Sequence, residues 1–359
     1  MQACFETLRS HPALDVRLFK GAGMANPGEQ SLRHFTRNGG AARVLALLTG
    51  RGPYVIEQVS FTAALLPHIA REQPDVIYFC DPAIGKMLSR WRRLRGGNYR
   101  LLFHNGGPIA PPFPWYDHIQ QVTPGAVDDA VAAGEPLGRQ TLLPCGLNIG
   151  PAPSPPGPEE RARRRRALGL PDGRPIVLSV GALNRAHKRM DYLVREVAAL
   201  AEPRPFLVMV GQTESDTATV RTIATFLLGE NGFAMRTVGA DQVADFYRAA
   251  DVFALASLKE GFGLGYVEAL AHGLPCIAHD FAVSQYVLGE FGILTDLRQP
   301  GALTGAIRAI LAAGSTLDEV RQRHASATAR FAWPNVAPEY VNMLRGCARQ
   351  PARELAVSA

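Results

Sequence analysis

Short apolar runs alternate with segments of helical spacing along most of the chain, and this alternation most constrains the fold. The runs read as buried strands: residues 74–80, 100–104, 176–180, 206–210 and 251–256. Glycine directly follows two of them, at positions 181 and 211. Strands that alternate with helices predict a mostly parallel sheet with helices on its faces, so we expect an α/β fold. In such sheets, ligands bind beyond the carboxyl ends of the strands.

A proline-rich segment divides this alternation into two parts. Residues 151–158 contain five prolines in eight positions, and such a segment cannot pair into a sheet. The chain has 359 residues, of which 47% are hydrophobic, enough for two buried cores. We therefore predict two domains with a cleft between them, over residues 1–150 and 151–334.

Composition excludes several classes of protein. No run of eighteen apolar residues occurs, so no membrane-spanning helix is expected, and the N-terminus lacks the pattern of a signal peptide. The five cysteines are scattered and never form C-x-x-C, which predicts buried thiols in a reducing compartment and hence a cytoplasmic protein: Cys4, Cys80, Cys145, Cys276 and Cys347. No motif interleaves aromatic and basic residues, so we expect no nucleic-acid partner.

The formal charge of +6 fits an anionic ligand or an anionic membrane surface. One predicted helix, residues 84–94, combines several arginines with Trp91, and such a helix can lie at the inner face of a membrane. The alternative is a solvated charged face. A second basic run, residues 161–166, follows the proline segment, and we interpret it as a solvated helix.

The turn between the strand at 251–256 and a helix at 266–272 contains three glycines. Glycines allow close approach of the backbone to a ligand, and the helix start offers N–H groups to a phosphate. Glu260 and Glu268 flank this turn; carboxylates repel phosphate but accept hydrogen bonds from hydroxyls. Phosphate beside hydroxyls indicates a nucleotide sugar. The alternative is an ordinary strand-to-helix turn with solvated acids.

Three further positions bear on the predicted cleft. Lys188 lies in a basic loop that follows the strand ending at Gly181, where a cation can neutralise a diphosphate. Gly239 follows another strand, where backbone groups could contact a nucleobase. His104 ends a strand of the first domain. A basic surface loop and a histidine bonded to a nearby carbonyl are the alternatives for Lys188 and His104.

Together these segments resemble the retaining glycosyltransferases of the GT-B fold, family four, which have two Rossmann-like domains. The similarity extends over about residues 74–345 and rests on five passages: residues 181–188, 238–251, 260–268, 268–276, and 123–124 with 143–148. The passage 260–268 matches the family's two glutamates separated by seven residues, including a Gly-Phe-Gly-Leu core.

The resemblance implies a role for each of these positions. Glu268 would hold the ribose hydroxyls and Glu260 those of the donated sugar, while Lys188 would contact the diphosphate. His104 would lie near the reacting sugar. The other donor-site positions that the resemblance implies are Gly181, Gly239, Phe262, and the backbone of Gly263 and Leu264. The C-terminal segment, residues 335–359, would cross back to the first domain as a helix with a tail.

Two departures from the family pattern stand out. Ala182 occupies a position where the family carries arginine, and we expect Arg185 to reach the same phosphate instead. The chain also opens with a predicted helix at 1–11 and a strand at 14–19, whereas the family opens with a strand and a glycine-rich loop. An innermost strand would then be missing from the first sheet. We expect the native start to lie upstream of Met1; the alternative is a divergent or damaged member of the family.

The resemblance implies transfer of a hexose from a nucleotide-diphosphate sugar to a polysaccharide, lipid or small-molecule acceptor, with retention of configuration. No Asp-x-Asp pair is present, so we expect neither a metal nor a cofactor. One alternative is an epimerase or hydrolase that uses the same donor without an acceptor. Another is a non-catalytic partner protein that binds the sugar nucleotide, which Ala182 and the missing strand favour.

Overall fold

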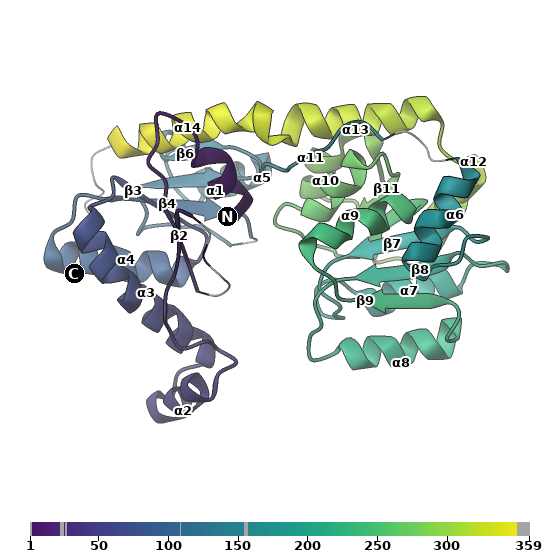
Figure 1. Ribbon diagram of the computed structural model, residues 1–359, viewed down its shortest axis with the longest axis horizontal. Helices are drawn as coiled ribbons and strands as arrows, with labels where there is room; N and C mark the ends of the chain where they lie inside the picture. The colour runs from purple at the N-terminus through teal and green to yellow at the C-terminus, as the bar shows by residue number, and fades with distance from the viewer. Residues whose placement is uncertain (1, 22–24, 26, 108, 154–156, 350–359) are drawn as a thin grey trace. The chain divides into compact units, whose positions relative to one another are not determined.

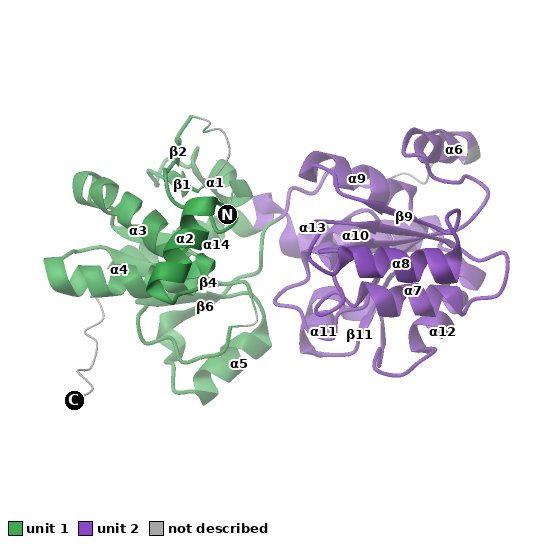
Figure 2. Cartoon of the chain, turned by 90° about the horizontal axis from the view of Figure 1, so that it is seen from below, with its two compact units in different colours: residues 1–146, 336–359 green, residues 147–335 purple. Residues whose placement is uncertain are grey.

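The computed structural model describes residues 2–21, 25, 27–107, 109–153 and 157–349 (Figure 1). The chain divides into two compact units, shown in different colours in Figure 2. Unit 1 comprises residues 1–146 and 336–359, and unit 2 comprises residues 147–335. In the described residues, no helix is both long and apolar enough to cross a membrane.

Unit 1 is built on a parallel sheet of four strands. In spatial order these are β3 (Val76–Phe79), β4 (Arg100–Asn105), β5 (His118–Gln121) and β6 (Gln140–Leu142). The helices are α1 (Gln2–Leu8), α2 (Gly40–Thr49), α3 (Pro53–Glu72), α4 (Pro82–Arg95) and α5 (Pro124–Ala132), with a 3₁₀ turn η1 (Leu137–Arg139). The side chains of Leu101 and Phe103 on β4 are fully buried, so the core lies on this central strand.

The N-terminal strand differs from the prediction. β1 (Leu18–Lys20) is shorter than the strand predicted at 14–19, and it pairs in parallel with β2 (Glu29–Ser31) in a separate two-stranded sheet. A salt bridge of 2.5 Å between the amine of Lys20 and the buried carboxylate of Glu29 joins the two strands. Among the described residues, β3 pairs with β4 alone, and a cavity of about 1200 Å³ is bordered by both β1 and β3.

Helix α4 carries less exposed charge than its sequence predicts. The N-cap of the helix is Asp81, whose carboxylate accepts hydrogen bonds from the amides of Ala83 and Ile84. Arg92 is buried and paired with Asp117 at 2.5 Å, rather than lying on a solvated or membrane-facing surface. Because Arg92 is buried, fewer arginines around Trp91 are exposed than the prediction assumed.

Unit 2 contains a six-stranded parallel sheet in the order β12-β11-β10-β7-β8-β9. The strands are β7 (Ile176–Val180), β8 (Phe206–Val210), β9 (Phe233–Arg236), β10 (Val252–Leu255), β11 (Cys276–His279) and β12 (Gly292–Thr295). The chain builds outward from β7 to β9, then returns to the other side of β7 with β10 and continues to β12. The strand order therefore reverses between β7 and β10, and crevices at such switch points bind ligands.

The helices of unit 2 follow the predicted alternation. They are α6 (Pro158–Ala167), α7 (Met190–Ala198), α8 (Thr217–Leu228), α9 (Ala240–Ala249), α10 (Leu264–Ala271), α11 (Ala282–Leu288), the 3₁₀ turn η2 (Gly289–Phe291), α12 (Ala302–Ala313) and α13 (Leu317–Phe331). Most apolar residues of the strands are buried, Leu178 and Val208 fully, whereas Ile293 on β12 is 37% exposed. Helix α11 lies between β11 and β12 in the chain.

The interpretation of the second basic run as solvated is wrong for one of its members. Arg165 on α6 is 2% exposed, and its guanidinium donates to a carboxylate oxygen of Asp251 at 2.7 Å. Arg161 pairs with the other oxygen of Asp251. Asp251 also accepts a hydrogen bond from the amide of Ile176, the first residue of β7. The two arginines therefore connect α6 through Asp251 to the starts of β7 and β10.

Helix α14 (Trp333–Arg349) begins in unit 2 and ends in unit 1. In unit 1 its Tyr340 is 2% exposed, and the hydroxyl donates to the carbonyl of Pro144 at 2.9 Å. The cysteines of the described residues are all free; Cys4, Cys276 and Cys347 are buried as predicted, whereas Cys80 is exposed and Cys145 is half-buried.

Candidate functional site at the strand-order reversal of unit 2

The loop after β7 and the loop after β10 meet through an ion pair. The amine of Lys188 donates to Oε1 of Glu260 at 2.5 Å, and both side chains are largely buried, at 15% and 7% exposure. β7 and β10 are neighbours in the sheet, so their following loops emerge side by side at the strand reversal. The structure thus brings together two residues that are 72 positions apart in the sequence.

Glycine at position 181 makes room for this lysine. A Cβ atom at Gly181 would lie 3.0 Å from Cε and 3.2 Å from Cδ of Lys188, tighter than normal van der Waals contact. The lysine stem therefore lies across the bare backbone that ends β7. The resemblance implies that Gly181 is a donor-site position, and the structure adds this steric role.

Asn184 organises the loop, and sequence reasoning missed it. Its Oδ1 accepts hydrogen bonds from the amides of His187 at 3.1 Å and Lys188 at 2.7 Å, and its amide group donates to Glu214 at 2.8 Å. Asparagine side chains that accept from backbone amides stabilise tight turns. The sequence does contain a signal for this role, because an asparagine is a polar turn residue and lies in the loop two positions after Ala182.

The second glutamate, Glu268, lies on α10, one helix turn after the first residue of the helix, Leu264. Oε2 of Glu268 accepts a hydrogen bond from the hydroxyl of Tyr247 at 2.8 Å. Burial raises the pKa of Glu268, and the hydrogen bond from Tyr247 works in the opposite direction. The ring of Tyr247 stacks on His272 with the centroids 5.2 Å apart, so Glu268 is positioned by α9 and by its own helix.

The start of α10 is shaped by Gly263. This residue is the N-cap and has φ +80°, in the left-handed region that favours glycine. Leu264, the first helical residue, is 47% exposed. Phe262 is 3% exposed and packs its ring edge-on against Phe331 at 5.6 Å, so any donor contact from Phe262 would come from its backbone.

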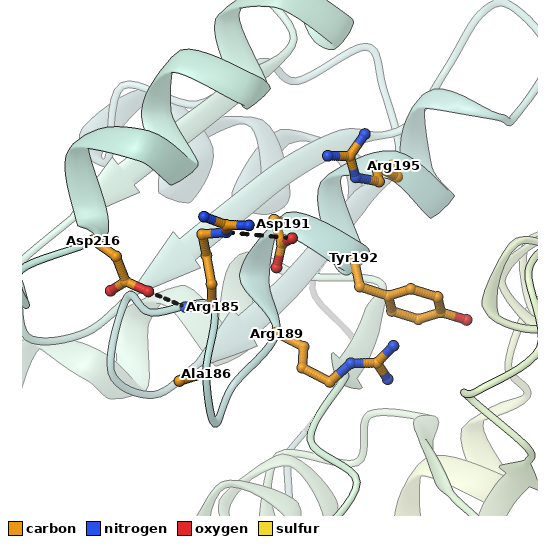
Figure 3. A pocket seen from close by; sticks show the side chains of 7 residues that line it. All are labelled: Arg185, Ala186, Arg189, Asp191, Tyr192, Arg195 and Asp216. Atoms are coloured by element: carbon orange, nitrogen blue, oxygen red, sulfur yellow. Dashed lines mark hydrogen bonds and ion pairs between the residues drawn. The ribbon is translucent and has the colours of Figure 1, made fainter.

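Arg185 lies in a separate open pocket of about 540 Å³ (Figure 3). Its guanidinium runs toward Asp191, with Nε 3.5 Å from the carboxylate, and its amide donates to Asp216 at 2.8 Å. Lys188 is not among the residues that line this pocket. In this conformation Arg185 is therefore engaged with acids rather than with the Lys188–Glu260 pair.

Gly239 precedes α9, and its amide donates to the side-chain oxygen of Gln242 at 3.2 Å. β9 ends at Arg236, so Gly239 is three residues beyond the strand rather than directly after it. The residue is exposed. Its carbonyl accepts from the amide of Gln242 at 3.0 Å, so both backbone groups of Gly239 take part in the helix cap. A contact with a base would use the second lone pair of this carbonyl.

His104 belongs to unit 1, on β4. Its Nδ1 lies 3.0 Å from Oε1 of Gln120, an acceptor, so Nδ1 carries the hydrogen. Burial lowers the pKa of His104, which keeps the ring neutral near pH 7. Nε2 is then an acceptor, and it lies 3.9 Å from the thiol of Cys145. The predicted alternative of a histidine bonded to a nearby carbonyl fits this ring, and the carbonyl is that of the Gln120 side chain.

The described residues contain no cluster of three or more His, Cys, Asp or Glu side chains arranged to hold a metal ion.

Comparison with known proteins agrees with this architecture. The chain has the GT-B fold, an α/β fold with two Rossmann-like domains, as do its structural neighbours among the glycosyltransferases. Residues 174–313, which include the Lys188–Glu260 pair, match the family Glycosyl transferases group 1.

Two solved structures illustrate the fold. Sucrose-phosphate synthase from Thermosynechococcus elongatus superposes with a TM-score of 0.74 at 22% identity, over 96% of this chain and 91% of the other. Anabaena Alr3699/HepE in complex with UDP-glucose gives 0.75 at 17% identity, over 96% and 95%.

Two sequence relatives are D-inositol 3-phosphate glycosyltransferases. The protein from Acidothermus cellulolyticus is 33% identical over 201 residues, which are 52% of this chain and 44% of the relative. The protein from Xylanimonas cellulosilytica is 31% identical over 231 residues, 61% and 54% of the two chains. The chain thus spans about half the length of the curated relatives it matches.

Proposed function

We propose that this protein is a glycosyltransferase that moves a hexose from a nucleotide-diphosphate sugar to an acceptor, with retention of anomeric configuration and without a metal. The observation that carries the proposal is the buried Lys188–Glu260 pair at the strand reversal of unit 2. A cation and an acid at that edge suit a ligand that combines phosphate with hydroxyl groups. The match of residues 174–313 to a glycosyltransferase family supports the same reading.

The ion pair suggests how the donor is received. In the free protein each side chain satisfies the other, which offsets the cost of burying two charges. A bound donor would replace both partners. Its diphosphate would take the place of Glu260 beside the amine of Lys188, and its sugar hydroxyls would take the place of Lys188 beside the carboxylate of Glu260. Both charges then stay compensated in the complex.

The chemistry follows from the same groups. Transfer breaks the bond between the anomeric carbon and the diphosphate, and negative charge develops on the leaving phosphate. Lys188 and the amide groups at the start of α10 would stabilise that charge, because a helix N-terminus carries partial positive charge. Glu268, oriented by Tyr247, would hold the ribose hydroxyls through Oε1 and Oε2.

The remaining predicted positions belong to the same proposal. Gly181, Gly239, Phe262, Gly263 and Leu264 would form the donor site with their backbones. Arg185 would reach the diphosphate by leaving Asp191, and neutral His104 would act beside the reacting sugar. Peripheral membrane contact, location in the cytoplasm, and the domain limits at residues 150 and 334 also stay proposals.

The test separates the two charged partners. UDP contains the diphosphate without the sugar, and Alr3699/HepE is described in complex with UDP and with UDP-glucose. We expect Lys188→Met to weaken UDP binding at least about tenfold and to lower turnover by about 10²–10³. Glu260→Gln should leave UDP binding unchanged or tighter, since it frees Lys188, while turnover of a UDP-sugar falls. If UDP does not bind, GDP and ADP with their sugars take its place.

Lys259→Met is the matched control, because Lys259 is exposed and adjacent to Glu260 in the chain. Its binding and turnover should equal those of the unsubstituted protein. Substituted proteins are compared below their melting temperatures, since Lys188→Met leaves a buried carboxylate unpaired. If Lys188→Met turns over the donor as fast as Lys259→Met does, Lys188 does not have the proposed role. Anomeric configuration of the product by NMR and activity in EDTA test retention and metal independence.

A further inference from the structure

Helix α2 presents an apolar face to solvent. Val44, Leu47 and Leu48 are spaced i, i+3, i+4, so they lie on one face of the helix. They are 55%, 85% and 77% exposed, whereas Ala42 and Ala46 are buried on the other side. Figure 1 shows α2 at the end of α3 that points away from the sheet of unit 1. Contiguous exposed aliphatic side chains mark an interaction surface.

The surroundings of this face are basic. Residues 31–56 contain four arginines, Arg33, Arg37, Arg43 and Arg51, and no Asp or Glu. Arg37 pairs with Glu57 at 2.5 Å. Within the described part of the chain, Arg33, Arg43 and Arg51 form no ion pair, and all three are exposed. The apolar face is therefore flanked by uncompensated positive charge.

We propose that α2 with these flanking arginines, here called the α2 face, binds the surface of an anionic lipid bilayer. Aliphatic side chains at the tip of a protruding helix can enter the boundary between headgroups and acyl chains, while arginines contact lipid phosphates. A helix with an apolar face and a basic border is the pattern of a protein that lies on a membrane rather than across it.

A second copy of the chain fits the α2 face less well. A symmetric dimer through this face would place the same patch of each copy against the other, and so would bring the arginines of both copies together. Like charges that face each other across an interface are unfavourable. The charge therefore favours an anionic surface over self-association.

The α2 face also differs from other exposed apolar positions. On α4, the helix of the earlier membrane prediction, Leu94 is 75% exposed, but Arg92 is buried in its pair with Asp117. On α8, Phe226 is 86% exposed. Its i−3 neighbour Ile223 packs against the core of unit 2, its i−4 neighbour is Thr222, and Gly229 at i+3 ends the helix, so Phe226 forms no exposed apolar stripe. Phe226 therefore serves as a matched control for exposure alone.

The test is co-sedimentation of the full chain with vesicles of phosphatidylcholine, with and without phosphatidylglycerol, at low and high salt. We expect binding to the anionic vesicles that weakens as salt rises. Leu47→Ser/Leu48→Ser should weaken that binding at least about tenfold, because two leucines no longer enter the lipid. Arg43→Gln/Arg51→Gln should weaken it about fivefold per arginine at low salt. Phe226→Ser should bind as the unsubstituted protein does.

Two results would overturn the proposal. One is absence of binding to the anionic vesicles, or binding that Leu47→Ser/Leu48→Ser does not change. The other is a dimer in analytical ultracentrifugation that Leu47→Ser/Leu48→Ser converts to monomer, which would assign the face to a second copy. The substituted side chains are exposed, and a melting curve for each variant verifies that the fold is intact.

Discussion

At the scale of single residues, the candidate site depends on charged side chains that are partly or fully buried. Glu268 is such a charge: burial raises its pKa above the usual value for glutamate, and the hydroxyl of Tyr247 is its hydrogen-bond donor. A carboxyl group whose pKa is higher in the folded protein than in the unfolded chain makes the folded protein less stable as pH rises. The ionised Glu268 therefore lowers the free energy of unfolding, and its carboxylate is held in place as a hydrogen-bond acceptor.

Glu268→Gln should raise stability at neutral pH. The amide removes the buried charge but still accepts from Tyr247 through its oxygen. Below about pH 4, where Glu268 is neutral in both states, unfolding midpoints of the two proteins should coincide. As pH rises through the folded-state pKa, the variant should become the more stable, and the difference should then stay constant. Urea unfolding across this pH range measures it; a variant less stable at pH 7 would contradict the argument. Donor binding should weaken.

For single residues, the sequence predicts which acids and glycines belong to the candidate site, but not which side chains they contact. Glu260 and Lys188 are identifiable from their loops, but their direct contact follows from the adjacency of β7 and β10 in the sheet. Arg165 shows the opposite case. A run of arginines reads as solvated, yet one of them is buried because Asp251, 86 residues later, lies beside it. Tertiary pairing over such distances leaves no local pattern.

At the scale of elements, helix and strand positions follow from local periodicity, and their ends follow from single residues. α8 lies at Thr217–Leu228 because its apolar spacing is regular and Gly229 ends it. Helix α10 instead starts two residues earlier than predicted, at Leu264, because Gly263 takes the left-handed conformation that starts the helix there. A glycine-rich turn allows several such starts, so sequence alone did not select one.

Gly263→Ala should destabilise unit 2 more than the backbone conformation alone explains. Gly263 and Gly301 are both N-cap residues with φ near +80°, where alanine costs about 1–2 kcal/mol. A Cβ atom at Gly263 would also lie 2.4 Å from Cδ2 of Tyr266, whereas at Gly301 nothing lies within 4 Å. We expect a loss of about 3 kcal/mol or more at 263 and about 1–2 kcal/mol at 301, measured by urea unfolding. Equal losses at both positions would show that Tyr266 moves aside freely.

At the scale of the whole molecule, the chain leaves unit 1 after Gly146 and returns at Val336. Unit 1 is therefore made of two segments that are far apart in sequence, with unit 2 inserted between them. The sequence predicted the α/β alternation of both parts, but the packing of the late segment depends on contacts that only the fold supplies. Gln120 on β5, for example, donates to the hydroxyl of Tyr340 at 3.0 Å across 220 residues.

Tyr340→Phe tests how strongly this late segment stabilises unit 1. The hydroxyl donates to the carbonyl of Pro144 and accepts from Gln120, and the side chain is 2% exposed. Phenylalanine keeps the ring but leaves buried polar groups without this partner, which should lower the free energy of unfolding by about 1–3 kcal/mol. Tyr192→Phe is the control, because its hydroxyl donates to Gln299 at the surface, where water can replace it; we expect a change within about 0.5 kcal/mol. Urea unfolding of both variants decides the matter: if Tyr340→Phe is as stable as Tyr192→Phe, then α14 is held to unit 1 by apolar packing alone.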